Sequence, residues 1–212
     1  MKRKIILILT AYVLLPIVGI VSCNKHDCGP FPNRYKTVGL DWFNYKAIYS
    51  DNPDSSFTLS EIENDSVDYN QYAILIKPKQ ETYFARSSNF GNFSLVKTAY
   101  ACSPVEPKTD EKIDSIVITS TKDYNANHPS GSDLSDLFDV VVVDHSNHVY
   151  YERYSLSNYI KTTPFVPNEL TLLLKEEAQQ TTDFEFLVKF YQDGIDKDYF
   201  EFLTNSIVIR KK

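Results

Sequence analysis

The residues best suited to chemistry stand in one short run, Asp144–His148, with the sequence Asp-His-Ser-Asn-His. Two imidazoles three positions apart could bind one metal ion if they lay on the same face of a helix. Asp, His and Ser are also the members of a nucleophilic triad, but the sequence holds no Gly-x-Ser-x-Gly motif to present a nucleophile. Strand-like sequences, Val140–Val143 and Val149–Tyr154, flank the run. We therefore interpret it as the polar tip of a hairpin rather than a metal or catalytic site.

Two sets of aspartates are the next candidates, because closely spaced carboxylates can supply oxygen ligands to calcium. The sets are Asp133, Asp136 and Asp139, and Asp193, Asp196 and Asp198. Neither follows the EF-hand spacing, in which alternate carboxylates precede a glycine and a late glutamate. Capping of one helical turn, from Asp133 to Phe138, explains the first set, and a turn explains the second. We expect no metal ion and no cofactor.

Tyrosines are abundant, with 15 in 212 residues, and an exposed group of them would offer a platform for a sugar or a protein partner. Most of them alternate within strand-like segments, which indicates packing against a core. Tyr150, Tyr151 and Tyr154 stand beside the run Asp144–His148 and form the group that we expect to be exposed. We predict a ligand-binding face there.

The N-terminal residues follow the order of a secretory signal, in which a basic start precedes an apolar core. Three basic residues open the chain, and Ile5–Ser22 contains no charged side chain. Eighteen helical residues reach about 27 Å, so on length alone a transmembrane anchor remains an alternative. The sequence Ile-Val-Ser-Cys that ends at Cys23 resembles the bacterial lipobox. This resemblance implies cleavage before Cys23 and acylation of that cysteine, and two or more acyl chains hold a protein durably at a membrane.

The lipobox divides the chain into a signal peptide (residues 1–22), a lipidated tether (residues 23–34) and a folded domain (residues 35–212). Removing the signal removes three basic residues and leaves 19 basic against 28 acidic side chains, a net charge of about −9. This balance disfavours a nucleic-acid partner, which needs clustered Lys and Arg. We expect a protein of the cell envelope, held through Cys23 at the outer membrane.

Two further cysteines, Cys28 and Cys102, remain if Cys23 carries lipid. A compartment outside the cytoplasm permits a disulfide between them, and the even number favours one. Two unpaired thiols are the alternative.

The body of the chain is patterned as strands. Turn signals about every ten to fifteen residues, with almost no helical periodicity, predict about nine or ten strands in an antiparallel all-β sandwich. The expected strands include Val38–Tyr49, Tyr72–Ile76, Thr82–Ala85, Phe93–Ala101, Ile113–Thr119, Val140–Val143, Val149–Tyr154, Phe184–Tyr191 and Tyr199–Leu203. The segment Leu170–Lys175 is compatible with a helix or a strand, and its short apolar block favours a strand.

Three looser patterns accompany the lipobox: Ala99–Pro104, Ser130–Phe138, and a hairpin from Phe184 to Leu203 that turns at Asp193-Gly194. Together they resemble small lipoproteins of the Bacteroidota envelope that carry an immunoglobulin-like domain of unknown function. The resemblance implies an immunoglobulin-like sandwich and transfers no catalytic residue. In that group, Asp followed by Ser or Thr and then an aliphatic residue resembles an O-glycosylation acceptor, which implies sites at Ser66 and Ser115.

We therefore expect a non-catalytic, lipid-anchored envelope protein that binds an envelope protein or a glycan. The first alternative is an envelope hydrolase, or an inhibitor of one, that uses the loops around Asp133–Asp139 and Asp144–His148. The second is a fimbrial or assembly subunit, which would present an unpaired edge strand to a donor strand.

Overall fold

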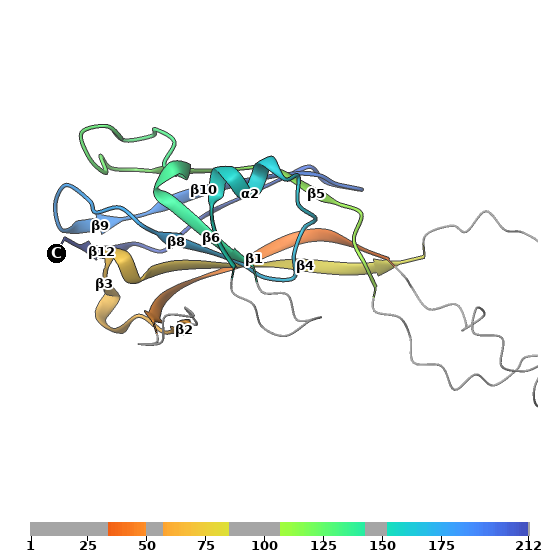
Figure 1. Cartoon of the computed structure of the whole chain (residues 1–212), viewed down its shortest axis with the longest axis horizontal. Coiled ribbons are helices and arrows are strands. Elements are labelled where there is room, and N and C mark those ends of the chain that lie inside the picture. Colours follow the sequence, from red (N-terminus) through yellow and green to blue (C-terminus); the bar gives the residue numbers. More distant parts are fainter. Residues whose placement is uncertain (1–33, 50–56, 85–106, 143–151, 212) are drawn as a thin grey trace, which may run out of the picture. The chain divides into compact units, whose positions relative to one another are not determined.

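Strands make up most of the described chain, which in this computed structural model comprises residues 34–49, 57–84, 107–142 and 152–211 (Figure 1). Within these ranges, Tyr35–Thr82 and Lys108–Lys212 form one compact unit. The strands are β1 (Arg34–Tyr49), β2 (Phe57–Ser60), β3 (Ser66–Asp68), β4 (Tyr72–Tyr83), β5 (Lys112–Ser120), β6 (Phe138–Val142), β7 (Glu152–Ser155), β8 (Leu170–Leu174), β9 (Thr182–Phe184), β10 (Phe186–Asp193), β11 (Tyr199–Leu203) and β12 (Ile207–Arg210). Between them lie the 3₁₀ helices η1 (Glu63–Asp65), η2 (Tyr69–Gln71) and η3 (Ser135–Leu137) and the α-helix α2 (Leu156–Lys161).

The largest sheet has the strand order β2-β1-β4-β8-β6-β7. The central strand β8 pairs antiparallel with both β4 and β6, so that Leu172 lies opposite Ile74 on one side and Val140 on the other. All five side chains of Leu170–Leu174 are buried, as a strand covered on both faces requires. The strand prediction for this segment is confirmed.

The second sheet has the order β11-β10-β5. In β10 the side chains of Phe186, Val188 and Phe190 are buried, and the residues between them are partly exposed. This period of two is the pattern of a strand with one face on the core. Strand β11 returns antiparallel to β10, with Phe200 opposite Phe190, which confirms the predicted hairpin from Phe186 onward. Phe184, where the prediction starts this strand, belongs instead to β9 in another sheet.

The loop of this hairpin requires glycine at position 194. A Cβ atom on Gly194 would lie 2.2 Å from the main-chain oxygen of Lys197. The N–H of Gly194 donates a hydrogen bond to Oδ1 of Asp198 at 3.1 Å, and the side-chain amide of Gln192 donates to the oxygen of Lys197 at 2.8 Å. The predicted turn at Asp193-Gly194 is therefore held by main-chain and carboxylate contacts of the loop itself.

The third sheet has the order β3-β12-β9. Strand β12 pairs antiparallel with β9 and parallel with β3, so that Ile209 lies opposite Thr182 and Val67. The parallel pair differs from the wholly antiparallel sandwich that the sequence predicts. Because β3 and β12 are far apart in the chain, no hairpin sets their relative direction.

One apolar core receives side chains from all three sheets, which gives a sandwich-like arrangement. Its members include Tyr72, Ile74 and Ile76 from β4, Phe186, Val188 and Phe190 from β10, and Ile207 and Ile209 from β12. The all-β sandwich prediction is confirmed.

The extent of β4 differs from the prediction, which ends a strand at Ile76 and starts another at Thr82. Strand β4 runs without interruption through Pro78 to Tyr83. The pairing of β4 with β8 ends at Ile76, so Pro78 stands where the strand has lost one neighbour. A residue without an N–H is tolerated at such a position.

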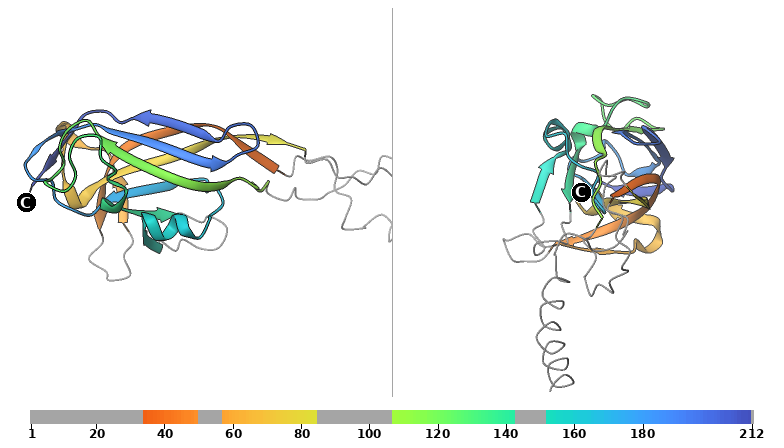
Figure 2. Two further views of the ribbon diagram at one scale, coloured as in Figure 1. Left: turned by 90° about the horizontal axis from the view of Figure 1, so that it is seen from above. Right: turned by 90° about the vertical axis from the view of Figure 1, so that its right-hand side faces the viewer.

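The sequence-based prediction does not include helix α2. In the structure, this helix lies beside β6 and β7 (Figure 2). Leu156, Tyr159 and Ile160 have the i, i+3, i+4 spacing of one helix face, and all three pack on the core. The segment is six residues long, which is too short for a helical period to stand out from the surrounding strands.

Candidate functional site

A wedge opens along β1 at the point where β2 separates from it. Strand β2 pairs with β1 only from Lys46, opposite Ser60, to Tyr49, opposite Phe57. After Ser60 the chain passes through η1 and continues as β3 beside β12. Among the described strands, the part of β1 that precedes Lys46 therefore has no partner on this side, and two adjoining pockets occupy the wedge.

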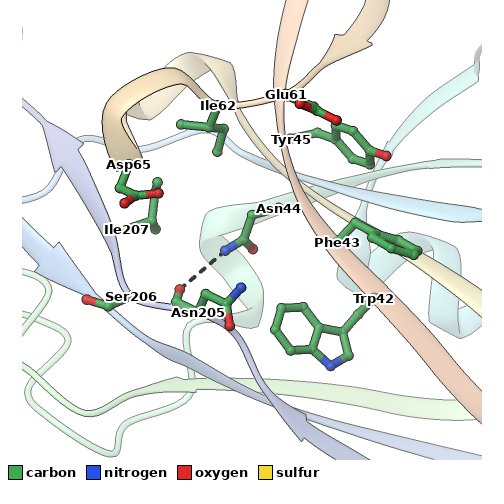
Figure 3. A pocket seen from close by; sticks show the side chains of 10 residues that line it. All are labelled: Trp42, Phe43, Asn44, Tyr45, Glu61, Ile62, Asp65, Asn205, Ser206 and Ile207. Atoms are coloured by element: carbon green, nitrogen blue, oxygen red, sulfur yellow. Dashed lines mark hydrogen bonds between the residues drawn. The ribbon is translucent and has the colours of Figure 1, made fainter.

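The first pocket has a volume of about 330 Å³. It is lined by Trp42–Tyr45 of β1, by Glu61, Ile62 and Asp65 around η1, and by Asn205–Ile207 at the start of β12. Trp42 and Asn44 point from β1 toward Asn205, whereas Phe43 and Tyr45 lie on the other side of the strand (Figure 3). The pocket thus combines aromatic rings with amide, carboxylate and hydroxyl groups.

The second pocket has a volume of about 520 Å³ and shares Glu61 with the first. Its lining includes Lys46 and Ile48 of β1 and Arg210 of β12. Because alternate residues of a strand share a face, the even-numbered residues from Trp42 to Ile48 line both pockets in turn over about 20 Å. We call the two pockets together the β1 groove, formed by residues 42–48, 60–66 and 205–210.

Trp42 is the single tryptophan of the chain and has a fixed orientation in the groove. Its ring stacks on Phe202 of β11, with 5.4 Å between ring centroids and 7° between ring planes. A ring held by a neighbour in this way loses little rotational freedom when a ligand contacts it.

Asn44 bridges the two walls of the first pocket. Its Oδ1 accepts a hydrogen bond from the hydroxyl of Tyr72 at 2.9 Å, and its Nδ2 donates to the main-chain oxygen of Asn205 at 3.2 Å. Burial of Tyr72 raises the pKa of its hydroxyl, so this donor stays protonated in neutral solution. The pocket is therefore formed before any ligand arrives.

Three exposed carboxylates, Glu61, Glu63 and Asp65, line the groove from one short segment. Arg210 is committed to Asp68, since its Nε lies 2.8 Å from Oδ1. Lys46 is therefore the cation of the groove that is left to face these acids, and the balance of charge in the groove is negative.

The segment that carries these acids has a special backbone. Asn64 and Asp65 have φ angles of 56° and 49°, in the left-handed region. Asn and Asp tolerate this region better than other residues with a side chain, because their short polar groups can bond locally. Two such residues in succession turn the chain sharply and set the direction of the Asp65 carboxylate.

Replacing Asn64 tests this backbone. We expect Asn64→Ala to lower the free energy of unfolding by about 1 kcal/mol, because alanine is strained at positive φ. Asn64→Gly should change it by about 0.5 kcal/mol or less. Urea unfolding of both variants measures the difference, and an equal loss for glycine and alanine would contradict the interpretation.

The aspartates that the sequence offered as an alternative site are engaged in the fold. Oδ1 of Asp133 accepts a hydrogen bond at 2.9 Å from the N–H of Ser135, the first residue of η3. The predicted helical turn is thus a 3₁₀ turn. The carboxylate of Asp136 lies 3.2 Å from Nε2 of His128.

Asp139 is held between two cations. Its Oδ2 lies 2.7 Å from Nε of Arg153, and its Oδ1 lies 3.4 Å from Nζ of Lys175. In the second set, Asp196 pairs with Lys36 and Asp198 accepts from the β10–β11 loop. Over the described ranges, no three His, Cys, Asp or Glu side chains gather in a way that could hold a metal ion.

The predicted tyrosine face is described at Tyr154 only, since Tyr150 and Tyr151 lie outside the described residues. Tyr154 is 41 % exposed and packs against Tyr159 of α2, with 6.3 Å between ring centroids. It stands on β7, at the edge of the large sheet opposite to β2. The structure therefore does not bring this tyrosine together with the β1 groove, and its role as a ligand contact stays a prediction.

Tyr159 makes the stability of the protein sensitive to alkali. Burial raises the pKa of Tyr159 from 10.0 to about 12. The unfolded chain therefore loses this proton first, so the contribution is complete below pH 10 and is lost as the pH rises toward 12. We expect Tyr159→Phe to keep the stability at neutral pH and to lose less of it over this window, as measured by urea unfolding at a series of pH values. A steeper loss in the variant would contradict the assignment.

The structure describes two of the remaining predicted site residues, Ser66 and Ser115. Cys23, Cys28, Cys102 and the run Asp144–His148 lie outside the described residues. Ser66 opens β3 and lines the second pocket, and Ser115 lies in β5; both are half-buried. Their glycosylation stays a prediction.

No helix in the described part of the chain combines the length and the apolar character needed to cross a membrane.

The β1 groove is absent from the sequence-based prediction. One signal was available: Trp42, Phe43 and Tyr45 are aromatic neighbours in a strand, and alternation sends them to opposite faces, so a single core cannot take all three. The ring on which Trp42 stacks, Phe202, and the facing wall at Asn205–Ile207 come from segments about 160 positions away, which no local pattern identifies.

Comparison with known proteins gives no match for this chain: neither a family model, nor a curated protein, nor a solved structure matches it.

Proposed function

We propose that this protein is a non-catalytic binding protein of the cell envelope, anchored through lipid on Cys23, and that its ligand occupies the β1 groove. The observation that carries the proposal is the groove itself, a preformed hollow about 20 Å long with an oriented aromatic ring and exposed polar groups. The ligand is an envelope glycan or an envelope protein.

The groove favours binding over catalysis. Its acids Glu61, Glu63 and Asp65 are all exposed and lie on one wall, so none is desolvated and none faces a second carboxylate across the cavity. Glycoside hydrolysis, for example, needs two carboxyl groups that flank the scissile bond. In the first of the two alternative hydrolase loops, Asp139 pairs with Arg153 and Lys175, and the second loop, Asp144–His148, lies outside the described residues.

The anchor is tested separately from the groove. Metabolic labelling with a fatty acid should mark the wild-type protein and should not mark Cys23→Ala, which should also leave the membrane fraction. Labelling that persists in Cys23→Ala would reject the anchor.

The groove is tested by capture in intact cells. Cross-linking of the full chain should recover a ligand that Glu61→Lys loses and that Asp193→Lys keeps. Asp193 is the matched control, because it is an exposed carboxylate at the end of β10, in another sheet. Equal recovery with both variants would place binding elsewhere and reject this function for the groove.

A further inference from the structure

The β1 groove has the composition of a saccharide site, and we propose that it binds an uncharged or amine-bearing oligosaccharide. This inference rests on the proposed function and names the ligand of the same groove.

The shape calls for a chain-like ligand. The two pockets share Glu61 and lie along β1 from Trp42 to Ile48, so a ligand that fills both is extended along the strand. A monosaccharide would fill only a part of a groove about 20 Å long. The groove therefore fits an oligomer of sugar rings.

The aromatic ring and the polar groups have complementary tasks. A sugar ring has an apolar face of C–H groups and a rim of hydroxyls. The fixed indole of Trp42 can receive the apolar face, since an aromatic ring offers a large contact area at a low entropy cost. Elsewhere in the same pocket, the planar side chains of Asn205, Glu61 and Asp65 can bond pairs of neighbouring hydroxyls.

The carboxylates of the groove are free to accept hydrogen bonds from sugar hydroxyls. Glu61, Glu63 and Asp65 are exposed and keep their oxygens available, whereas Asp68 and Asp139 are taken up by cations of the fold. A carboxylate accepts hydrogen bonds only, and sugar hydroxyls are abundant donors. Hydrogen bonds from hydroxyls to an ionised carboxylate are stronger than hydrogen bonds between neutral groups.

The charge selects among sugars. With Arg210 bound to Asp68, the three acids share the groove with one other cation, Lys46, and the whole chain carries a net charge of −6. A uronic acid or a sulfated sugar would bring like charge to this wall, which is unfavourable. Neutral sugars meet no such penalty, and the ammonium group of an amino sugar would be attracted.

An extended peptide is the other occupant to consider, because no described strand pairs with β1 on the β2 side before Lys46. A peptide would add to that edge through main-chain hydrogen bonds. The wall across the wedge is built from side chains around η1, with Asp65 and Asn64 in left-handed turns, and it presents carboxylates and amides to the ligand. These groups match hydroxyls better than they match a strand, so the observations favour a saccharide.

Trp42 reports directly on the groove, since it is the only tryptophan in the chain. We would titrate the full chain under selective tryptophan excitation with maltotetraose, cellotetraose, mannotetraose, a glucosamine tetramer and tetragalacturonate, and with a library of extended peptides. The expected result is a saturable change in fluorescence with at least one neutral or amino-sugar tetramer. Tetragalacturonate should bind about tenfold more weakly or not at all.

Variants locate the binding. Glu61→Gln and Asp65→Asn should each raise the dissociation constant about tenfold, which corresponds to the loss of one hydrogen bond to a charged group. Asp193→Asn should leave the dissociation constant unchanged. Equal affinity in all three variants would place the sugar outside the groove and overturn the inference.

Two outcomes separate this inference from the proposed function. A groove that binds peptides and no tetrasaccharide overturns the saccharide inference and leaves a binding protein. A groove that binds neither, together with a failed capture in intact cells, overturns both.

Discussion

Phe186→Ala is expected to lower the free energy of unfolding by about 3–5 kcal/mol. Phe186 is fully buried, and its ring packs on the rings of Tyr72, Phe138 and Phe184 at centroid distances of 5.5, 5.7 and 6.0 Å. These rings come from β4, β6 and β9, so the substitution leaves a cavity where all three sheets meet. Neighbouring rings cannot collapse into it without breaking their own contacts.

Thermal and urea unfolding measure this loss, which should lower the Tm by about 10 °C. Phe165→Ala is the matched control. Phe165 is 57 % exposed, and Nζ of Lys112 lies 5.6 Å from the centroid of its ring. The loss of this ring should therefore lower the free energy of unfolding by about 1 kcal/mol at most. Similar losses for the two variants would contradict the position of Phe186 at the centre of the core.

Glu111→Gln is expected to cost about 2–3 kcal/mol, although it removes no apolar contact. Glu111 is 1 % exposed, and its two carboxylate oxygens accept main-chain hydrogen bonds from Thr37 at 2.7 Å and Ile195 at 3.1 Å. The carboxylate thus connects β1 to the β10–β11 loop. In glutamine, one of the two oxygens becomes an NH₂ group, which would face an N–H donor and leave it without a partner.

Urea unfolding checks this prediction, with Asp193→Asn as the exposed control that should change stability by about 0.5 kcal/mol or less. Glu111→Ala should cost at least as much as the glutamine variant, because it leaves both donors unpaired. Retention of wild-type stability in Glu111→Gln would show that the two main-chain bonds do not depend on the charge.

The parts of the fold that local patterning controls were predictable. Phe186–Asp193 alternates because one face meets the core, and Leu170–Leu174 is uniformly apolar because both faces are covered. Asp193-Gly194 marks its turn because a side chain at Gly194 would collide with Lys197. Each of these features depends on residues within one strand or one hairpin.

The parts that depend on distant pairing were not predictable. Strand β4 continues through Pro78 only because its β8 partner ends earlier, and the direction of β12 depends on β3. From the sequence alone, Glu111 would be expected at the surface, because acidic side chains are seldom buried. Only the fold shows that two main-chain N–H groups donate to it. The groove is the extreme case, because its three walls are contributed by separate segments of the chain.

The Asn44–Asn205 bond across that groove joins residues 161 positions apart, so the groove exists only in the completed fold. An unfolded or half-folded chain offers the ligand nothing comparable to bind. By mass action, a ligand that binds only the native state adds about 2.7 kcal/mol of stability at a hundred times its dissociation constant. The ligand would therefore also act as a folding cofactor: where it is abundant, the native population and resistance to proteolysis rise with its concentration.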